Sequence, residues 1–331
     1  MVVCIPAGWK NRAHRAVVAR GVSGLYSRVT PIYLGRVLLV CASLFGAGGS
    51  IFAQSDSGPA SRTMQAGGME RSYLIHLPAS HDPGQPLPVL VVLHGAGGDG
   101  PGMAEHTGLT EAATRRGYAV VYPNGVARRW NDGRVSSPQD DVGFIRLLLD
   151  SLGRELPVDT GRLYATGISN GAGLAYRLAC ELPGTFAAIA PVAGAPAAGL
   201  EERCAATRPI SLISFQGTRD PLMPYGGGDA SSGRGRVLGA ARSAALFARV
   251  NGCAPTPTAS AESDTVRDGT RVSRAVYAGC TDGREVVLYT IEGGGHTWPG
   301  GPPVGRRVGR VSRDLDATRT MLDFFDHHSQ P

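Results

Sequence analysis

The sequence predicts a single α/β domain with a mostly parallel central sheet and helices on both faces. Short apolar runs rich in β-branched residues alternate with longer stretches of helical periodicity across residues 60–331. Such alternation is typical of strands joined by crossover helices. No linker, repeat or low-complexity tract divides that region. The composition, with 42% hydrophobic and 18% charged residues, is that of an ordinary globular protein.

The first 53 residues are expected to be an export signal. They contain six basic residues and no acidic residue, and the apolar run 37–55 follows the basic part. Glycines interrupt this run, which is short for a membrane span, so an uncleaved membrane anchor is the weaker alternative. We expect a signal peptide over 1–53, a short segment over 54–67 and the folded domain over 68–331. The mature protein would then be secreted or periplasmic, without stable membrane association.

The charge of the remaining chain argues against nucleic acid as a partner. The whole sequence carries a formal charge of +6, but the remainder after residue 53 has 27 basic and 27 acidic residues. A balanced chain lacks the excess positive charge that nucleic-acid binding requires. The remainder also has no lysine, which excludes Schiff-base chemistry.

The strands are predicted from apolar runs of two kinds. The segment 72–78 alternates apolar and polar residues and is expected to be an edge strand, whereas 87–95 is continuously apolar, as in a buried parallel strand. Further strands are expected at 118–125, 162–168, 186–194, 210–217, 272–279 and 285–293.

The helices are predicted from apolar stripes and terminal residues. The segment 140–156 places apolar residues on one helical face, and an aspartate begins it as a cap. The segment 102–117 ends at a glycine, a common helix stop. Further helices are expected at 171–182, 239–252 and 315–328. In such a sheet, ligands bind beyond the carboxyl ends of the strands.

Ser169 is the candidate nucleophile. It lies in Gly-Ile-Ser-Asn-Gly (167–171), between a predicted strand and a predicted helix. Small residues two positions before and after a serine permit the sharp strand-to-helix turn known as a nucleophile elbow, which exposes the hydroxyl at the sheet edge. A chance Gly-x-Ser-x-Gly in a glycine-rich chain is the alternative, and the flanking strand and helix argue against it.

A serine nucleophile needs a base and a carboxylate that orients the base. His296 follows the last predicted strand, where a histidine is expected if the order along the chain is serine, acid, histidine. Asp220 is the favoured acid because it lies just past the strand 210–217, from which a carboxylate can reach a histidine loop. The rival carboxylates are Asp264, Asp268 and Asp282.

The glycine-rich loop at 93–100 is expected to stabilise an oxyanion. It follows the first buried strand, so its backbone N–H groups can face the site. Ala96 is one candidate donor, and Asn170, the residue after the serine, is the other. A phosphate-binding loop is the alternative, but the loop lacks a lysine and the Gly-x-Gly-x-x-Gly spacing.

Four cysteines follow the predicted signal: Cys180, Cys204, Cys253 and Cys280. Pairing is the default in an oxidising compartment, and four cysteines allow three connectivities. The simplest joins sequence neighbours, Cys180 to Cys204 and Cys253 to Cys280. The absence of Cys-x-x-Cys and His-Glu-x-x-His motifs argues against a metal site.

Six motifs together resemble one family. LHGAGG, YPNG, DDVGF, GISNGAG, FQGTRDPLMPYGGG and GGGHTWPGG occur in the order of the secreted polyhydroxybutyrate depolymerase and feruloyl esterase family of α/β-hydrolases, over about residues 68–328. The resemblance implies the α/β-hydrolase fold, with Ser169 as nucleophile, Asp220 as acid and His296 as base. It also supports the Cys180–Cys204 disulfide. Polymer-degrading members commonly add a linker and a separate binding domain, which this sequence does not contain.

The resemblance implies hydrolysis of carboxylic esters without a cofactor. We expect hydroxyalkanoate oligomers or short-acyl esters as substrates, and feruloyl or acetyl esters of plant polysaccharides as the alternative. Trp130 and Trp298 are expected to line the acyl or alcohol pocket. A serine peptidase of the same fold and an inactive polymer-binding module are weaker alternatives. The sequence does not predict an oligomeric state.

Overall fold

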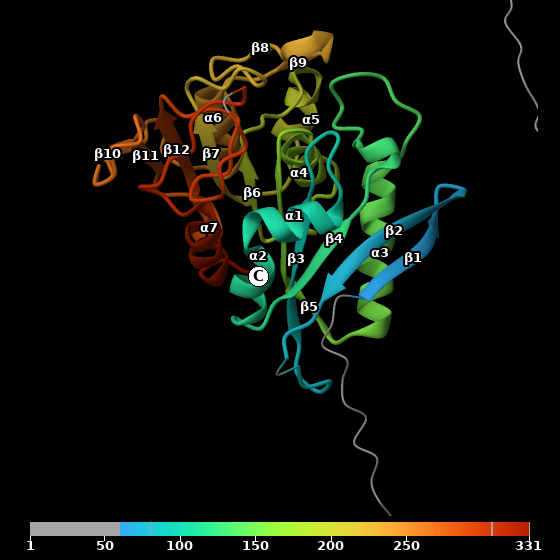
Figure 1. The fold of residues 1–331 in the computed structure, drawn as a ribbon. Helices are drawn as coiled ribbons and strands as arrows, with labels where there is room; N and C mark the ends of the chain where they lie inside the picture. The colour runs from blue at the N-terminus through green and yellow to red at the C-terminus, as the bar shows by residue number, and fades with distance from the viewer. Residues whose placement is uncertain (1–59, 80, 306, 331) are drawn as a thin grey trace, which may run out of the picture. The chain divides into compact units, whose positions relative to one another are not determined.

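Six neighbouring strands in the centre of the sheet run parallel (Figure 1). The structure, a computed structural model, describes residues 60–330 except residues 80 and 306 and the side chain of residue 232. The spatial order of the main sheet is β1-β2-β4-β3-β5-β6-β7-β12-β11-β10. Its strands are β1 (Ala60–Ala66), β2 (Met69–His76), β3 (Leu87–Leu93), β4 (Ala119–Pro123), β5 (Val158–Ile168), β6 (Ala188–Val192), β7 (Ser211–Gly217), β10 (Thr258–Ala261), β11 (Arg271–Tyr277) and β12 (Val286–Glu292).

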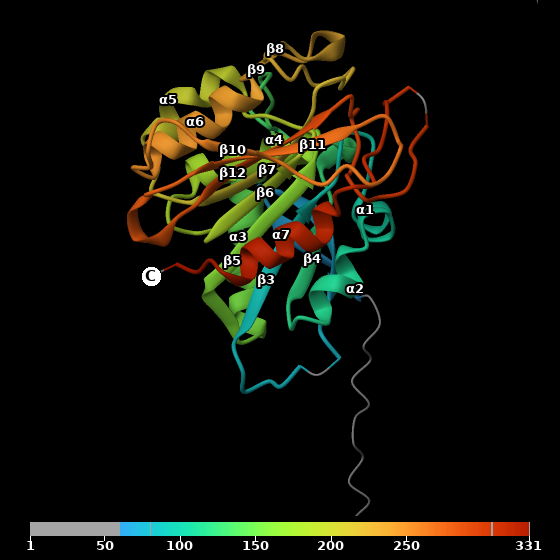
Figure 2. The ribbon, with the colours of Figure 1, turned by 90° about the vertical axis from the view of Figure 1, so that its left-hand side faces the viewer.

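Helices cover both faces of this sheet (Figures 1 and 2). One face packs against α3 (Asp141–Glu155), α4 (Asn170–Glu181) and α6 (Ala240–Val250), and the other against α1 (Gly100–Thr107), α2 (Leu109–Thr114) and α7 (Ala317–Asp326). Successive residues of a strand point to opposite faces. In β3, Val91 and Leu93 therefore join one core, and Leu90 and Val92 join the other.

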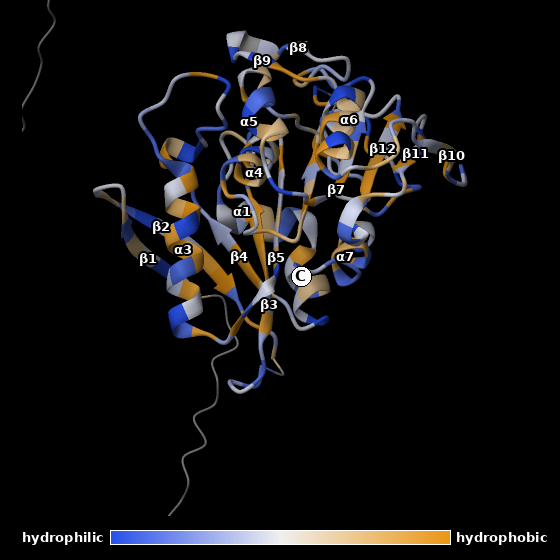
Figure 3. Cartoon of the chain, turned by 180° about the vertical axis from the view of Figure 1, so that it is seen from behind, coloured by the Kyte–Doolittle hydropathy of each residue, from blue (hydrophilic) through white to orange (hydrophobic). Residues whose placement is uncertain are grey.

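The buried strands explain why the sheet is predictable from sequence. All seven residues of β3 and all seven of β7 are buried, and Figure 3 shows the apolar colouring concentrated in the central strands. A strand covered on both faces needs apolar residues at every position. The predicted α/β class, with a mostly parallel sheet and helices on both faces, is confirmed.

Three details differ from the expectations. The segment 72–78 was expected to be an edge strand, but β2 pairs with both β1 and β4, so β1 forms the edge. Because β1 is part of the sheet, the folded domain begins by residue 60 and not at 68. The helix expected at 102–117 is two helices, α1 and α2, separated at Gly108, whose φ of 64° is left-handed and ends α1.

Elements too short for a periodicity signal complete the fold. They include α5 (Glu201–Ala205) and the small hairpin of β8 (Gly228–Asp229) and β9 (Arg236–Val237). The expected signal peptide, residues 1–53, lies outside the described residues. Among the described helices, none has both the length and the apolarity needed to cross a bilayer.

Both disulfides join sequence neighbours, as the simplest pairing predicts. Cys180 at the end of α4 is bonded to Cys204 in α5, with Cα atoms 4.4 Å apart. Cys253 is bonded to Cys280, and their Cα separation of 3.8 Å is shorter than the usual range of about 4.4–6.8 Å. In the chain-entropy model, loops of this size stabilise the fold by about 3 kcal/mol each.

Candidate active site

Ser169 occupies a strained turn between β5 and α4. Its φ of 59° and ψ of −117° are unusual for a residue with a side chain. A Cβ atom on Gly167 would lie 2.6 Å from the Leu93 carbonyl oxygen, and one on Gly171 would lie 2.3 Å from the same oxygen. Only glycine fits at either position, so the backbone can turn sharply and present the serine beyond the sheet edge.

Asp220 and His296 form a close pair. The structure places Oδ2 of Asp220 2.7 Å from Nδ1 of His296, and both side chains are buried. The other carboxylate oxygen of Asp220 accepts hydrogen bonds from the N–H groups of Leu222 and Met223. These bonds fix the carboxylate, which in turn fixes the imidazole ring.

The three rival aspartates lie elsewhere. Asp264 pairs with Arg271, and Asp268 accepts hydrogen bonds from Thr270. Asp282 is exposed in a turn with a φ of 55°. Among the residues that the structure describes, Asp220 is therefore the acid next to His296.

Ser169 and His296 line one cavity of about 450 Å³. Its wall also includes Ala96 from the glycine-rich loop and apolar side chains such as Met103 and Leu222. Burial lowers the pKa of His106 at this cavity, which favours its neutral form near pH 7. The serine, histidine and glycine-rich loop come together here because β3, β5 and β12 end at the same edge of the sheet.

Of the two expected oxyanion donors, Ala96 lines the same cavity as Ser169, and Asn170 directly follows the serine. Asn170 is the first residue of α4, where a helix leaves its N–H groups free to bind a ligand. Ala96 lies in the turn closed by the Gly98 N–H and the Gly95 carbonyl. Within the described part of the chain, neither the Ala96 nor the Asn170 N–H has a protein acceptor. Both N–H groups are thus available to a developing anion.

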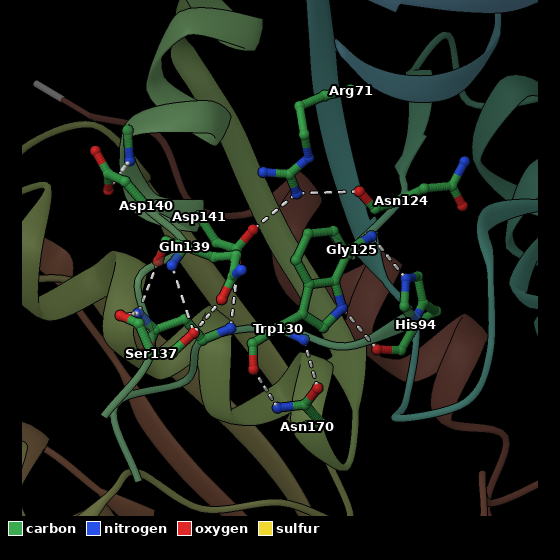
Figure 4. A network of polar contacts seen from close by, with 12 residues as sticks. Arg71, His94, Asn124, Gly125, Trp130, Ser137, Gln139, Asp140, Asp141 and Asn170 are labelled. Carbon is green, nitrogen blue, oxygen red and sulfur yellow. Dashed lines mark hydrogen bonds and ion pairs between the residues drawn. The ribbon is translucent and has the colours of Figure 1, made fainter. Parts of the chain in front are cut away.

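Trp130 connects the two segments that carry these donors, through its indole and its backbone (Figure 4). Its Nε1–H donates to the His94 carbonyl at 2.8 Å, two residues before Ala96. The backbone of Trp130 exchanges two hydrogen bonds with the Asn170 side chain, at 2.7 and 3.0 Å. One residue therefore links the loop that carries Ala96 with the start of the helix that carries Asn170.

The His94 ring reinforces the same loop. The Gly125 N–H donates to His94 Nε2, so the neutral ring carries its proton on Nδ1 and donates it to the Gly95 carbonyl at 2.8 Å. Burial lowers the pKa of His94, which favours this neutral form. The Gly97 N–H also donates to the Arg128 carbonyl. The loops 94–98 and 125–130 are therefore held together at several points.

A buried ion pair underlies this arrangement (Figure 4). Arg71 of β2 donates to Asp141 at the start of α3, at 2.7 Å, and both side chains are buried. Arg71 also donates to the Asn124 carbonyl, and Asp141 accepts from the Asn131 N–H. Asn124 precedes Gly125 and Asn131 follows Trp130, so the pair anchors both ends of the 125–130 loop.

The two tryptophans do not have the expected role. Trp130 is 5% exposed and Trp298 is 1% exposed, and neither lines the cavity. Trp298 Nε1–H donates to Thr318 of α7, inside the core. Each indole is held inward by an apolar environment and a buried acceptor for its N–H. The expectation of substrate-lining tryptophans was therefore wrong.

Sequence reasoning did not identify Arg71, His94 or Asp141. His94 lies within the glycine-rich loop 93–100, and Asp141 lies in the DDVGF motif, so each has a local signal. Arg71 had none, because its partner is 70 residues away. Within the described residues, no group of three or more His, Cys, Asp or Glu side chains could hold a metal ion.

Comparisons with known proteins agree with this geometry. A family model described as esterase PHB depolymerase matches residues 71–213. "Putative esterase NocK" of Nocardia uniformis subsp. tsuyamanensis is 34% identical over 292 residues, which cover 82% of this chain and 83% of that protein. The chain belongs to the esterase PHB depolymerase family.

Other relatives of this chain are named feruloyl esterases. Feruloyl esterase D of Neurospora crassa is 28% identical over 92% of this chain and 99% of its own length. The solved acetyl xylan esterase of Aspergillus awamori shares the fold, with a TM-score of 0.57 and 14% identity over 81% of this chain and 99% of that chain. The protein has the α/β-hydrolase fold and is a carboxylic ester hydrolase.

Proposed function

We propose that the protein is an exported esterase that uses Ser169, His296 and Asp220 as a catalytic triad. The observation that carries this proposal is the 2.7 Å contact between Asp220 and His296, together with the cavity that His296 and Ser169 both line. A carboxylate, an imidazole and a serine in this order can activate the hydroxyl for attack on an ester.

The reaction proceeds through an acyl-enzyme. His296 removes the proton of Ser169 as Oγ attacks the ester carbonyl, and the N–H groups of Ala96 and Asn170 receive the resulting oxyanion. Collapse of this intermediate expels the alcohol, which takes the proton from His296. Water, activated by the same histidine, then releases the acid. Asp220 holds the ring in the required tautomer and stabilises the imidazolium.

Short-acyl esters and hydroxyalkanoate oligomers are the proposed substrates. The cavity of about 450 Å³ is lined by side chains of mixed polarity, and no tryptophan, tyrosine or phenylalanine is among its described lining residues. Small acyl groups do not need an aromatic platform. The two disulfides fit an extracytoplasmic location, which the basic and apolar leader also favours.

Replacement of the nucleophile tests the proposal. Ser169→Ala should lower kcat for a short nitrophenyl ester by about 10⁴-fold or more, because the members of a triad act as a unit. Circular dichroism should show an unchanged fold. Ser243→Ala, which removes a buried hydroxyl on α6, serves as the control and should retain the wild-type rate. A Ser169→Ala rate within tenfold of wild type would contradict the assignment.

Feruloyl ester hydrolysis is the second candidate. The names of the relatives favour it, whereas burial of Trp130 and Trp298 removes the aromatic surfaces expected to stack on a feruloyl ring. Specificity constants for methyl ferulate, short nitrophenyl esters and hydroxybutyrate oligomers decide between them. A preference of more than tenfold for methyl ferulate, or about 1.4 kcal/mol in transition-state binding, would establish the feruloyl alternative.

A further inference from the structure

A second cavity lies next to the proposed active site and is lined by four arginines. Its volume is about 720 Å³, and its wall includes Arg219, Arg267, Arg271 and Arg310. All four arginines are exposed, so their guanidinium groups reach solvent without a desolvation cost. We call this cavity the arginine groove. The catalytic chemistry described above does not use it.

The positive charge of the arginine groove exceeds its negative charge. Only Asp264 and Glu292 contribute carboxylates to the wall, against four guanidinium groups. Asp264 contacts Arg271 at 3.4 Å, and Glu292 lies opposite Arg271 in the pairing of β11 with β12. In the described part of the chain, Arg219, Arg267 and Arg310 have no carboxylate partner within 4.0 Å.

The backbone shapes the groove around Arg310. Gly269 has a φ of 78°, and a Cβ atom there would lie 3.1 Å from Arg310 Nε. The absence of a side chain at this position lets the guanidinium of Arg310 pack closely against the backbone. The hydroxyl oxygen of Thr218 accepts from the Gly293 N–H at 2.9 Å. Its proton therefore remains available to a ligand in the groove.

Two chain segments each line both the arginine groove and the catalytic cavity. Arg310 lines the groove and Val308 lines the cavity, and residues two apart in a chain are separated by at most about 7 Å. On the second wall, Arg219 lines the groove and Leu222 the cavity, with Asp220 between them. Backbone hydrogen bonds join the walls to the histidine loop, from the His296 N–H to Val308 and from the Gly295 N–H to Arg310.

We propose that the arginine groove binds the carboxylates of an acidic polysaccharide whose ester group lies at Ser169. This inference rests on the proposed function and concerns the first of its two proposed substrate classes, the short-acyl esters, for which it specifies the alcohol. Guanidinium groups bind carboxylates through paired hydrogen bonds. The exposed hydroxyl of Thr218 suits a sugar hydroxyl, and Val266 is the one aliphatic side chain larger than alanine in the wall, so the groove is predominantly polar.

Nucleic acid fits the groove less well than a uronate chain. The two carboxylates in the wall would repel the closely spaced charges of a phosphate backbone. A sugar chain carries at most one carboxylate per uronate unit. These carboxylates can contact the arginines of the wall while they avoid its two carboxylates.

Matched polymeric substrates test the proposal. The wild-type enzyme should hydrolyse acetylated polygalacturonate with a kcat/KM at least about tenfold above that for neutral acetylated xylan of equal acetyl content, in about 0.02 M salt. This ratio should approach one in about 0.5 M salt, because salt screens exposed charges. The double variant Arg219→Gln/Arg310→Gln should lose most of the preference at low salt.

A matched double variant controls for the loss of two positive charges. Arg146→Gln/Arg154→Gln removes two exposed arginines from α3, and it should keep the wild-type ratio. Equal rates on the two polymers by the wild type, or an unchanged ratio in Arg219→Gln/Arg310→Gln, would overturn the acidic-polysaccharide assignment. Failure of the wild type to hydrolyse nitrophenyl acetate would instead overturn the proposed esterase function, so the two failures are distinguishable.

Discussion

At the scale of single residues, the acid of the proposed triad depends on one carboxylate in a fixed orientation. Asp220 uses one oxygen for His296 and the other for two backbone N–H groups. A carboxylate held at both oxygens cannot rotate away from the imidazole. The functional consequence is that the tautomer of His296 is set before substrate binds.

Asp220→Asn tests this role directly. The amide keeps the size of the carboxylate but favours the wrong histidine tautomer, so kcat should fall by about 10⁴-fold with little change in the thermal midpoint Tm. Asp282→Asn is the matched control because Asp282 is exposed in the turn Thr281–Gly283, and asparagine tolerates its left-handed φ of 55°. Steady-state kinetics on a nitrophenyl ester measure both. Equal activity of the two variants would mean that another group orients His296.

At the scale of elements, the candidate oxyanion hole is assembled from parts distant in sequence. Ala96 follows β3, Asn170 begins α4, and the loop after β4 supplies Trp130. No single helix or strand fixes the position of one N–H group relative to the other. The hydrogen bonds of Trp130 to His94 and Asn170 connect them, and the Arg71–Asp141 pair fixes the connecting loop. Preorganised donors of this kind need no rearrangement as charge develops.

Trp130→Phe should separate positioning from binding. The variant keeps an aromatic ring but leaves the His94 carbonyl without its donor, a loss of about 1–3 kcal/mol for a buried group. We expect kcat to fall by about 10–100-fold while KM changes by less than about twofold, because the donors matter most in the transition state. Inhibition by a trifluoromethyl ketone, which forms the tetrahedral anion, should weaken by a similar factor.

A tyrosine in the core provides the control for Trp130→Phe. Tyr164→Phe also removes one buried donor, to the His328 carbonyl at 2.6 Å, but away from the loops of the site. Both variants should lower Tm, and only Trp130→Phe should lower kcat. A kcat for Trp130→Phe that matches Tyr164→Phe would show that the indole serves stability alone.

At the scale of the whole molecule, histidines that are buried or half-buried make stability depend on pH. Desolvation lowers the pKa of four histidines, namely His76, His94, His106 and His328. In the unfolded chain these groups take up protons near pH 6.5, whereas in the folded protein they do so only at lower pH. The unfolded state therefore binds more protons below about pH 6.5, and stability falls as the pH falls through this range.

Thermal unfolding at several pH values tests this expectation. The Tm should decrease between about pH 7.5 and pH 5.5, and His328→Asn should show a smaller decrease because one such group is gone. The slope is the measured quantity, so a lower Tm of the variant at all pH values does not affect the test. A slope in His328→Asn as steep as in the wild type would contradict a contribution from this histidine.

Much of the fold and part of the site could be predicted from local sequence. Continuous apolar runs predict the buried central strands because both faces of each strand are covered, and Gly-Ile-Ser-Asn-Gly marks the elbow because only glycine fits at Gly167 and Gly171. His296 and Asp220 are predicted from their positions after strands, and the structure brings the two side chains within 2.7 Å of each other. Short elements such as α5, β8 and β9 lack enough residues for a periodic signal.

What the sequence alone determined is therefore the set of elements whose signal lies within a few residues of the chain, including the serine turn and the strands that end beside it. The cysteine pairing was left open among three connectivities, and the structure shows the sequence-neighbour one. The tertiary structure decided which side chains face the cavity and which face the core. Trp130 and Trp298 are buried by residues far away in sequence, and Arg71 meets Asp141 across 70 positions. The physical reason is that these features depend on distances in space, which the packing of the elements sets. They include the burial of side chains, the formation of ion pairs and the grouping of four arginines in one groove.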